Sequence, residues 1–149
     1  MPAFAFATPG TTVSIESYLT NKGQNYLQRY TNASNRLADD FNLICGSVFC
    51  QGQYGRILPL PMRCFVDSGT GDLRTCIWAF GKSTVWIGRE SAIEKSGEVE
   101  FCEFKPTMTA EVFIATIENA RVSGQTPYLS IVFPGVGTTL TNVLANCLR

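Results

Sequence analysis

The chain has 149 residues, of which 45% are hydrophobic and only 16% are charged. This length allows one domain with a full hydrophobic core, and the small charged fraction indicates a surface partly covered by partners, as in a homo-oligomer. The 12 Lys and Arg residues balance the 12 Asp and Glu residues, so the chain lacks the global basic field of a strong nucleic-acid binder, and the absence of histidine excludes Ser-His and Cys-His nucleophiles.

Residues 1–40 predict an N-terminal extension ahead of the main fold. A short strand is expected at 3–7 and a helix from Ser14 to about Tyr30, with Gly23 as a weak point. Residues 32–40 are polar and indicate a linker. The N-terminus has no cationic segment and its apolar run is too short for a signal peptide, so the six cysteines are expected in a reducing compartment, the cytoplasm, or in a virion.

Residues 41–122 predict the main domain, which is mainly β. Apolar alternation and turn residues indicate five strands and one short helix. The strands are expected at Phe41–Phe49, Arg56–Val66, Leu73–Phe80, Glu98–Lys105 and Ala110–Val122, and the helix at Ser83–Lys95. Residues 123–149 then predict a strand at Tyr128–Phe133 and an amphipathic helix from about Thr138. No stretch is long enough to span a membrane.

Two of these strands carry aromatic residues interleaved with cations. In the third strand, a side-chain period of two places Arg74, Trp78 and Phe80 on one face, and in the second it places Arg63 and Phe65 opposite an apolar row. Such a surface stacks bases and contacts phosphates, although Trp78 and Phe80 are equally well explained as core residues. The predicted nucleic-acid contacts are Arg56, Arg63, Phe65, Arg74, Trp78, Phe80, Lys82 and Lys105.

Four segments in the middle of the chain carry a family resemblance. They are Asn42-Leu-Ile-Cys-Gly-Ser-Val48, Ile77-Trp-Ala-Phe-Gly-Lys82, Lys95-Ser-Gly-Glu-Val-Glu-Phe101 and Glu111-Val-Phe-Ile-Ala115. In this order they resemble four strand motifs of the bacterial-type single-stranded DNA-binding proteins. The resemblance implies an OB-fold, a five-stranded Greek-key barrel, with Phe80 at a matching base-stacking position and Arg74 where the family has a tryptophan.

Three classes of function follow from the sequence. The first is non-catalytic binding of single-stranded DNA or RNA with little sequence specificity, without a cofactor or metal. The alternative is a structural subunit of a viral capsid or tail, in which the terminal segments clasp neighbouring copies. An enzyme is the third class. Phe65-Val-Asp-Ser-Gly-Thr70 resembles the catalytic turn of aspartic proteases, and Val85-Trp-Ile-Gly-Arg89 resembles the glycine-arginine segment of the retroviral type. The two segments lie too close in the sequence to leave room for the flap that excludes water from the paired carboxylates, so the sequence predicts that the protein is not an enzyme.

Overall fold

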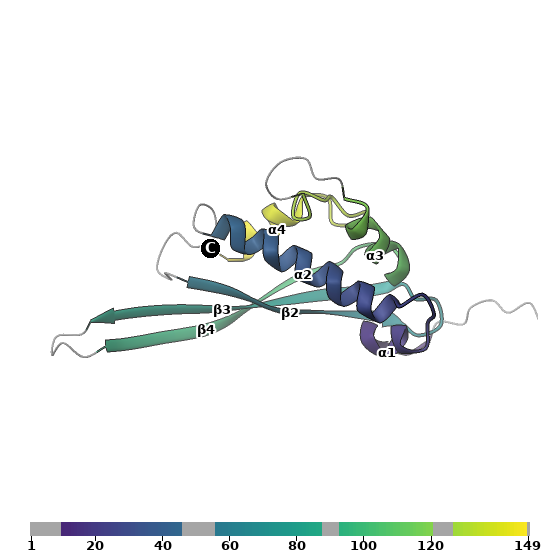
Figure 1. Ribbon diagram of the computed structural model, residues 1–149, viewed down its shortest axis with the longest axis horizontal. Coiled ribbons are helices and arrows are strands. Elements are labelled where there is room, and N and C mark those ends of the chain that lie inside the picture. Colours follow the sequence, from purple (N-terminus) through teal and green to yellow (C-terminus); the bar gives the residue numbers. More distant parts are fainter. Residues whose placement is uncertain (1–9, 46–55, 88–92, 121–126, 149) are drawn as a thin grey trace, which may run out of the picture.

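The computed structural model describes residues 10–45, 56–87, 93–120 and 127–148 (Figure 1), and the fold is given for these ranges. The elements, in chain order, are β1 (Thr12–Ser14), α1 (Ile15–Thr20), α2 (Tyr26–Ile44), β2 (Arg56–Asp67), β3 (Leu73–Ile87), β4 (Ile93–Phe104), α3 (Ala110–Glu118) and α4 (Leu140–Cys147). None of the helices in these ranges is both long and apolar enough to cross a membrane. The expected strand at 3–7 lies outside the described residues.

The described strands form one open antiparallel sheet in the order β1-β2-β3-β4. Helices α2, α3 and α4 lie together over one face of this sheet (Figure 1). The expectation of a mainly β protein with a closed, five-stranded OB-like barrel is therefore wrong. The chain forms a two-layer structure of helices on a sheet, in which the edges β1 and β4 do not meet.

Two segments predicted to be strands are helical over most of the residues that the structure describes. The segment expected to be a linker and the start of the first strand belongs to α2, whose buried residues Tyr30, Ala33, Leu37 and Phe41 recur every three or four positions. The expected fifth strand is α3, where the Thr109 side chain accepts a hydrogen bond from the backbone of the first turn. In both segments helical spacing of the apolar residues outweighs the β propensity of the individual residue types.

The expected short helix at Ser83–Lys95 is also wrong, because β3 continues to Ile87 and β4 begins at Ile93. Between Thr84 and Ile87, β3 pairs with β4 alone, whereas β2 pairs with β3 only as far as Ser83. The two strands therefore continue as a hairpin past the helices (Figure 1).

At the C-terminus, the strand expected at Tyr128–Phe133 is a turn, with a single bridge between Val132 and Thr139. The closing helix is confirmed as α4, with Leu140 and Leu144 buried.

The hydrophobic core lies between the sheet and the helices. From Cys76 to Phe80 every second residue of β3 faces it, and the Phe41 ring of α2 lies 4.8 Å from the Phe80 ring. Polar contacts join the same layers, because the Tyr30 hydroxyl donates to the Met62 carbonyl oxygen at 2.9 Å. Residues of α1, α2, the sheet, α3 and α4 belong to one continuous core, so the N-terminal helices are part of the same packing unit as the strands.

Two disulfides join described residues. Cys64 and Cys76 are directly opposed on β2 and β3, with Cα atoms 4.0 Å apart, and Cys102 of β4 is bonded to Cys147 of α4. Disulfides persist in oxidising environments and are rare in the cytosol. The expectation of a reducing, cytoplasmic compartment is therefore wrong. The virion alternative stays a prediction.

Candidate functional site

Three of the predicted nucleic-acid contacts are buried beneath the helices. Trp78 is 1% exposed and its Nε1 donates to the Leu60 carbonyl oxygen at 2.9 Å, while the Phe80 ring lies 4.8 Å from the Trp78 ring. Lys82 is also buried, with its Nζ 3.8 Å from a carboxylate oxygen of Glu100. In this structure Trp78 and Phe80 are core residues, as the competing interpretation of the sequence held, and they offer no surface to a base.

Arg74 lies beside an irregularity in the strand pairing and does not share the row of Trp78 and Phe80. The register between β2 and β3 shifts between Phe65 and Val66, so the alternation along β3 is interrupted at Arg74. The guanidinium of Arg74 instead donates to the Oδ2 atom of Asp67 at 2.6 Å.

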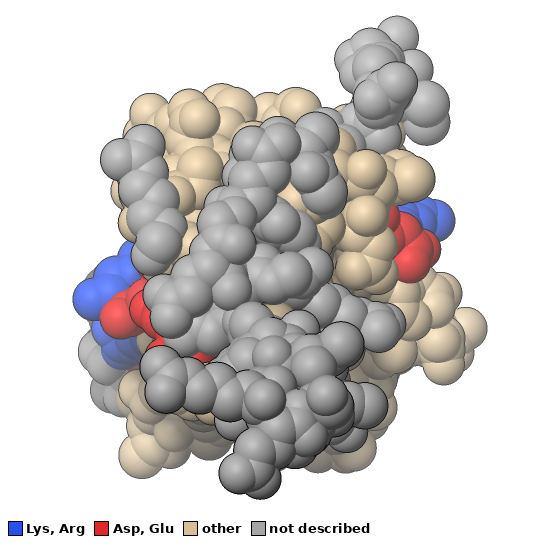
Figure 2. Space-filling model, turned by 90° about the vertical axis from the view of Figure 1, so that its left-hand side faces the viewer, with Lys and Arg blue, Asp and Glu red and all other residues tan. Residues whose placement is uncertain are grey.

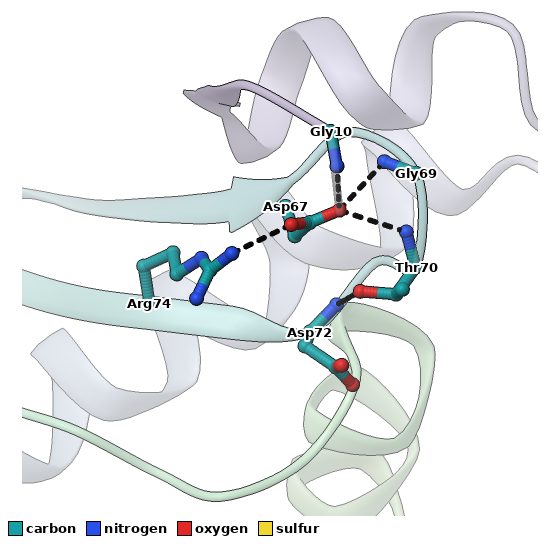
Figure 3. A network of polar contacts seen from close by, with 6 residues as sticks. All are labelled: Gly10, Asp67, Gly69, Thr70, Asp72 and Arg74. Atoms are coloured by element: carbon teal, nitrogen blue, oxygen red, sulfur yellow. Dashed lines mark hydrogen bonds and ion pairs between the residues drawn. The ribbon is translucent and has the colours of Figure 1, made fainter. Parts of the chain in front are cut away.

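Asp67 is the centre of a polar network at the end of β2 (Figure 3). Its Oδ1 atom accepts backbone N–H bonds from Gly10, Gly69 and Thr70 at 2.8–3.0 Å, while Oδ2 accepts the bond from Arg74. These donors, with that of Gly10 the strongest, hold the pKa of Asp67 down at about 2. The carboxylate of the protease-like turn thus fixes the β2–β3 turn to the chain ahead of β1.

The opposite face of the sheet is not covered by any described helix, and we call it the open face. Its side chains alternate with the buried rows of β2, β3 and β4. It consists of Leu58, Pro61, Arg63, Phe65, Thr75, Ile77, Ala79, Gly81, Val99, Phe101 and Glu103. Most of these residues are apolar, which is unusual for the solvent side of an antiparallel sheet.

A shallow groove of about 360 Å³ runs along β3 on the open face. Ile77 and Ala79 form its floor, and the residues of β2 and β4 on either side form its walls. Phe101 is 64% exposed and Val99 is 52% exposed, so bulky apolar side chains of the edge strand β4 stand in solvent. An exposed apolar edge of this kind is a common site of association.

The charged groups of the open face occupy opposite walls of the groove. Arg63 lies on β2 and Glu103 on β4, and both are paired in register with Ile77. Glu103 accepts a hydrogen bond from the Thr75 hydroxyl at 2.8 Å, and the exposed Lys105 lies 3.5 Å from the same carboxylate. Among the residues that the structure describes, Arg63 takes part in no ion pair.

The structure therefore separates the predicted site residues into groups. Arg63 and Phe65 lie on the open face, with Lys105 beside it, whereas Trp78, Phe80 and Lys82 lie on the other side of the sheet. Arg56 begins β2, and its side chain lies outside the described residues. The sequence interpretation missed Ile77, Ala79, Val99, Phe101 and Glu103, although the alternation of Val99, Phe101 and Glu103 within a predicted strand is the signal that places them on one face.

Charge is sparse on the described surface at one end of the molecule. In Figure 2 the few basic side chains that are visible lie at the margins, next to acidic ones, and most described residues there are uncharged. In the ranges that the structure describes, no three His, Cys, Asp or Glu side chains gather into a possible metal site.

No family model, curated protein or solved structure matches this chain. The resemblance to single-stranded DNA-binding proteins stays a prediction from the sequence motifs.

Proposed function

We propose that this protein is a structural subunit that assembles with other protein molecules through the open face of its sheet. The observation that carries the proposal is the apolar character of this face, where Ile77, Val99 and Phe101 stand opposite a core that is already complete. A sheet with helices on one side ordinarily turns polar residues toward water on the other. Large exposed apolar patches instead mark surfaces that are covered by a partner.

Two further properties support an assembling role. The disulfides Cys64–Cys76 and Cys102–Cys147 fasten β2 to β3 and β4 to α4, so the strands that carry the open face are held in fixed positions. The low charged fraction is that of a chain whose surface is partly buried in contacts. The capsid or tail subunit predicted from the sequence is one class of such an assembly.

Binding of a single nucleic-acid strand is the second candidate function, and it would use the same face. Phe65 and Phe101 line the groove together with Arg63, and Lys105 lies beside it. Base stacking on aromatic side chains with cations nearby is how open sheets bind single strands. Glu103 stands on the same face and repels phosphates, and the zero net charge gives no general attraction, so protein association is the function favoured.

The test compares Phe101→Glu with Val112→Glu. Both replace an exposed apolar residue, but Val112 lies on α3, away from the open face. Sedimentation velocity over a range of concentrations should show that the wild type and Val112→Glu associate, whereas Phe101→Glu stays monomeric. Association that survives Phe101→Glu would overturn the proposal. Saturable binding of labelled oligo-dT by a monomer, lost in Phe101→Glu, would establish the second candidate in its place.

A further inference from the structure

We infer that the molecule covering the open face is a second copy of this chain, packed face to face around a two-fold axis that runs parallel to β3. The inference rests on the proposed function and specifies the partner of the same surface. It is supported by the order of residues across the three strands. When two copies of the open face are packed against each other by this rotation, each charged residue meets a residue of opposite charge.

The strand register supplies the pattern. Arg63 on β2, Ile77 on β3 and Glu103 on β4 are paired in one row across the sheet. The two charges lie two strand spacings apart, about 10 Å, on either side of the middle strand. A rotation about an axis along β3 exchanges the two sides, so β2 of one copy faces β4 of the other. Ile77 then meets the partner's Ile77 near the axis.

This arrangement pairs opposite charges twice. Arg63 faces the partner's Glu103, and Glu103 faces the partner's Arg63. An axis perpendicular to the strands would place β2 over the partner's β2 and β4 over the partner's β4, so that Arg63 would not face the partner's Glu103. If that axis passed through the row of Ile77, Arg63 would meet the partner's Arg63. Because packed sheets lie about 10 Å apart and exclude water, an unpaired charge in such a contact is strongly unfavourable. The charge pattern therefore selects the axis parallel to β3.

The apolar rows fit the same axis. Leu58 and Val99 are both paired with Gly81, so the rotation brings Leu58 opposite the partner's Val99. Phe101 is paired with Ala79, so the rotation places it over the partner's β2, near the partner's Pro61. The small residues Ala79 and Gly81 leave room along the middle strand, and the two Phe101 rings can occupy it from opposite sides.

Charge also distinguishes a second copy from an unrelated apolar partner. Covering the open face buries the Arg63 guanidinium, which has no ion pair among the described residues, together with Glu103, whose carboxylate lies 3.5 Å from the exposed Lys105. Burying Arg63 without an opposite charge is strongly unfavourable. A partner that places an acid opposite Arg63 and a base opposite Glu103, at the same separation and in the reverse order, therefore fits this face. The face itself meets this requirement, since its two charges lie on opposite walls of one groove.

Charge reversal tests the axis directly. Arg63→Glu and Glu103→Arg each place like charges in contact, so each single variant should raise the dimer Kd by about tenfold or more. The double variant Arg63→Glu/Glu103→Arg recreates opposite pairs across the axis and should return the Kd to within about twofold of the wild type. Lys22→Glu makes the same change of charge as Arg63→Glu, but at an exposed position between α1 and α2, so it should leave the Kd unchanged. Sedimentation velocity measures each Kd, and far-UV circular dichroism checks that each variant is folded.

An equimolar mixture of the two single variants provides an independent measurement. Each mixed dimer again brings opposite charges together at both contacts, so the mixture should associate more tightly than either variant alone.

The outcomes separate this inference from the proposed function. Suppose that the wild type dimerises, but the single variants bind as tightly as Lys22→Glu, or the double variant does not regain the wild-type Kd. This result would overturn the two-fold arrangement, and the assembling role would stand. If the wild type stays monomeric at every concentration, both proposals are overturned.

Discussion

Replacing Trp78 with alanine is expected to remove a large part of the stability of the fold. The indole is 1% exposed, and its ring lies 6.3 Å from Phe41 and 4.8 Å from Phe80. Truncating a large buried aromatic residue costs about 3–5 kcal/mol, and here the Leu60 carbonyl also loses its 2.9 Å hydrogen bond. Because a domain is stable by about 5–15 kcal/mol in total, the substitution should remove a third or more of the free energy of unfolding.

Urea unfolding at concentrations where the chain is monomeric measures this loss, and Phe101→Ala is the matched control. Phe101 is 64% exposed, so its truncation should change the monomer's stability by no more than about 0.5 kcal/mol. Trp78→Ala should lower the unfolding midpoint by roughly 1 M urea or more. Trp78→Phe, which keeps a ring but loses the N–H donor, should fall between the two. Equal losses for Trp78→Ala and Phe101→Ala, or no loss for Trp78→Ala, would refute the assignment of the buried and open faces.

Acid should destabilise the wild type more than Asp67→Asn, because the folded pKa of about 2 lies below the ordinary value of an aspartate near 4. The stabilisation by ionised Asp67 is complete at pH values above the ordinary aspartate pKa and is lost as the pH falls toward the folded pKa. The urea midpoints of the two proteins should therefore converge between about pH 4 and pH 2. A difference between the midpoints that does not change with pH would contradict this role. Replacing both cysteines of the Cys64–Cys76 pair with alanine should cost about 3 kcal/mol, since the closed loop spans 12 positions. For the Cys102–Cys147 pair, which spans 45 positions, the cost should be about 4 kcal/mol, and a milder effect than at the first pair would contradict the loop-entropy explanation.

Local signals in the sequence predicted some elements of the fold well. Strands β2, β3 and β4 and the closing helix α4 were expected near their observed positions, because each combines a clear periodicity with turn or capping residues at its ends. The prediction failed where two patterns compete. The pattern of residues 83–95 predicted a short helix, but pairing of Cys76–Ile87 with β4 stabilises a hairpin. That pairing joins positions that no local window compares.

The sequence left the burial of the aromatic row on β3 undecided, and for a different reason. A period of two correctly grouped Cys76, Trp78 and Phe80 on one side of β3, and Ile77 with Ala79 on the other. Periodicity does not say which side faces inward, and the opposite choice exchanges the two rows. The deciding element is α2, which packs Phe41 against Trp78 and Phe80. Its residues 32–44 were expected to be a linker and the start of a strand.

The ambiguity of β3 has a physical cause in the proposed assembly. Strands that are buried on one side alternate apolar and polar residues, whereas strands buried on both sides are apolar throughout. From Cys76 to Phe80, β3 is apolar on both faces, which is the composition of a strand in the middle of two packed layers. The helices of the chain supply one of these layers. In the assembly that we propose, a second copy packed on the open face would supply the other, with Ile77 at the centre of the contact, so the composition of β3 would reflect the assembly as well as the single chain.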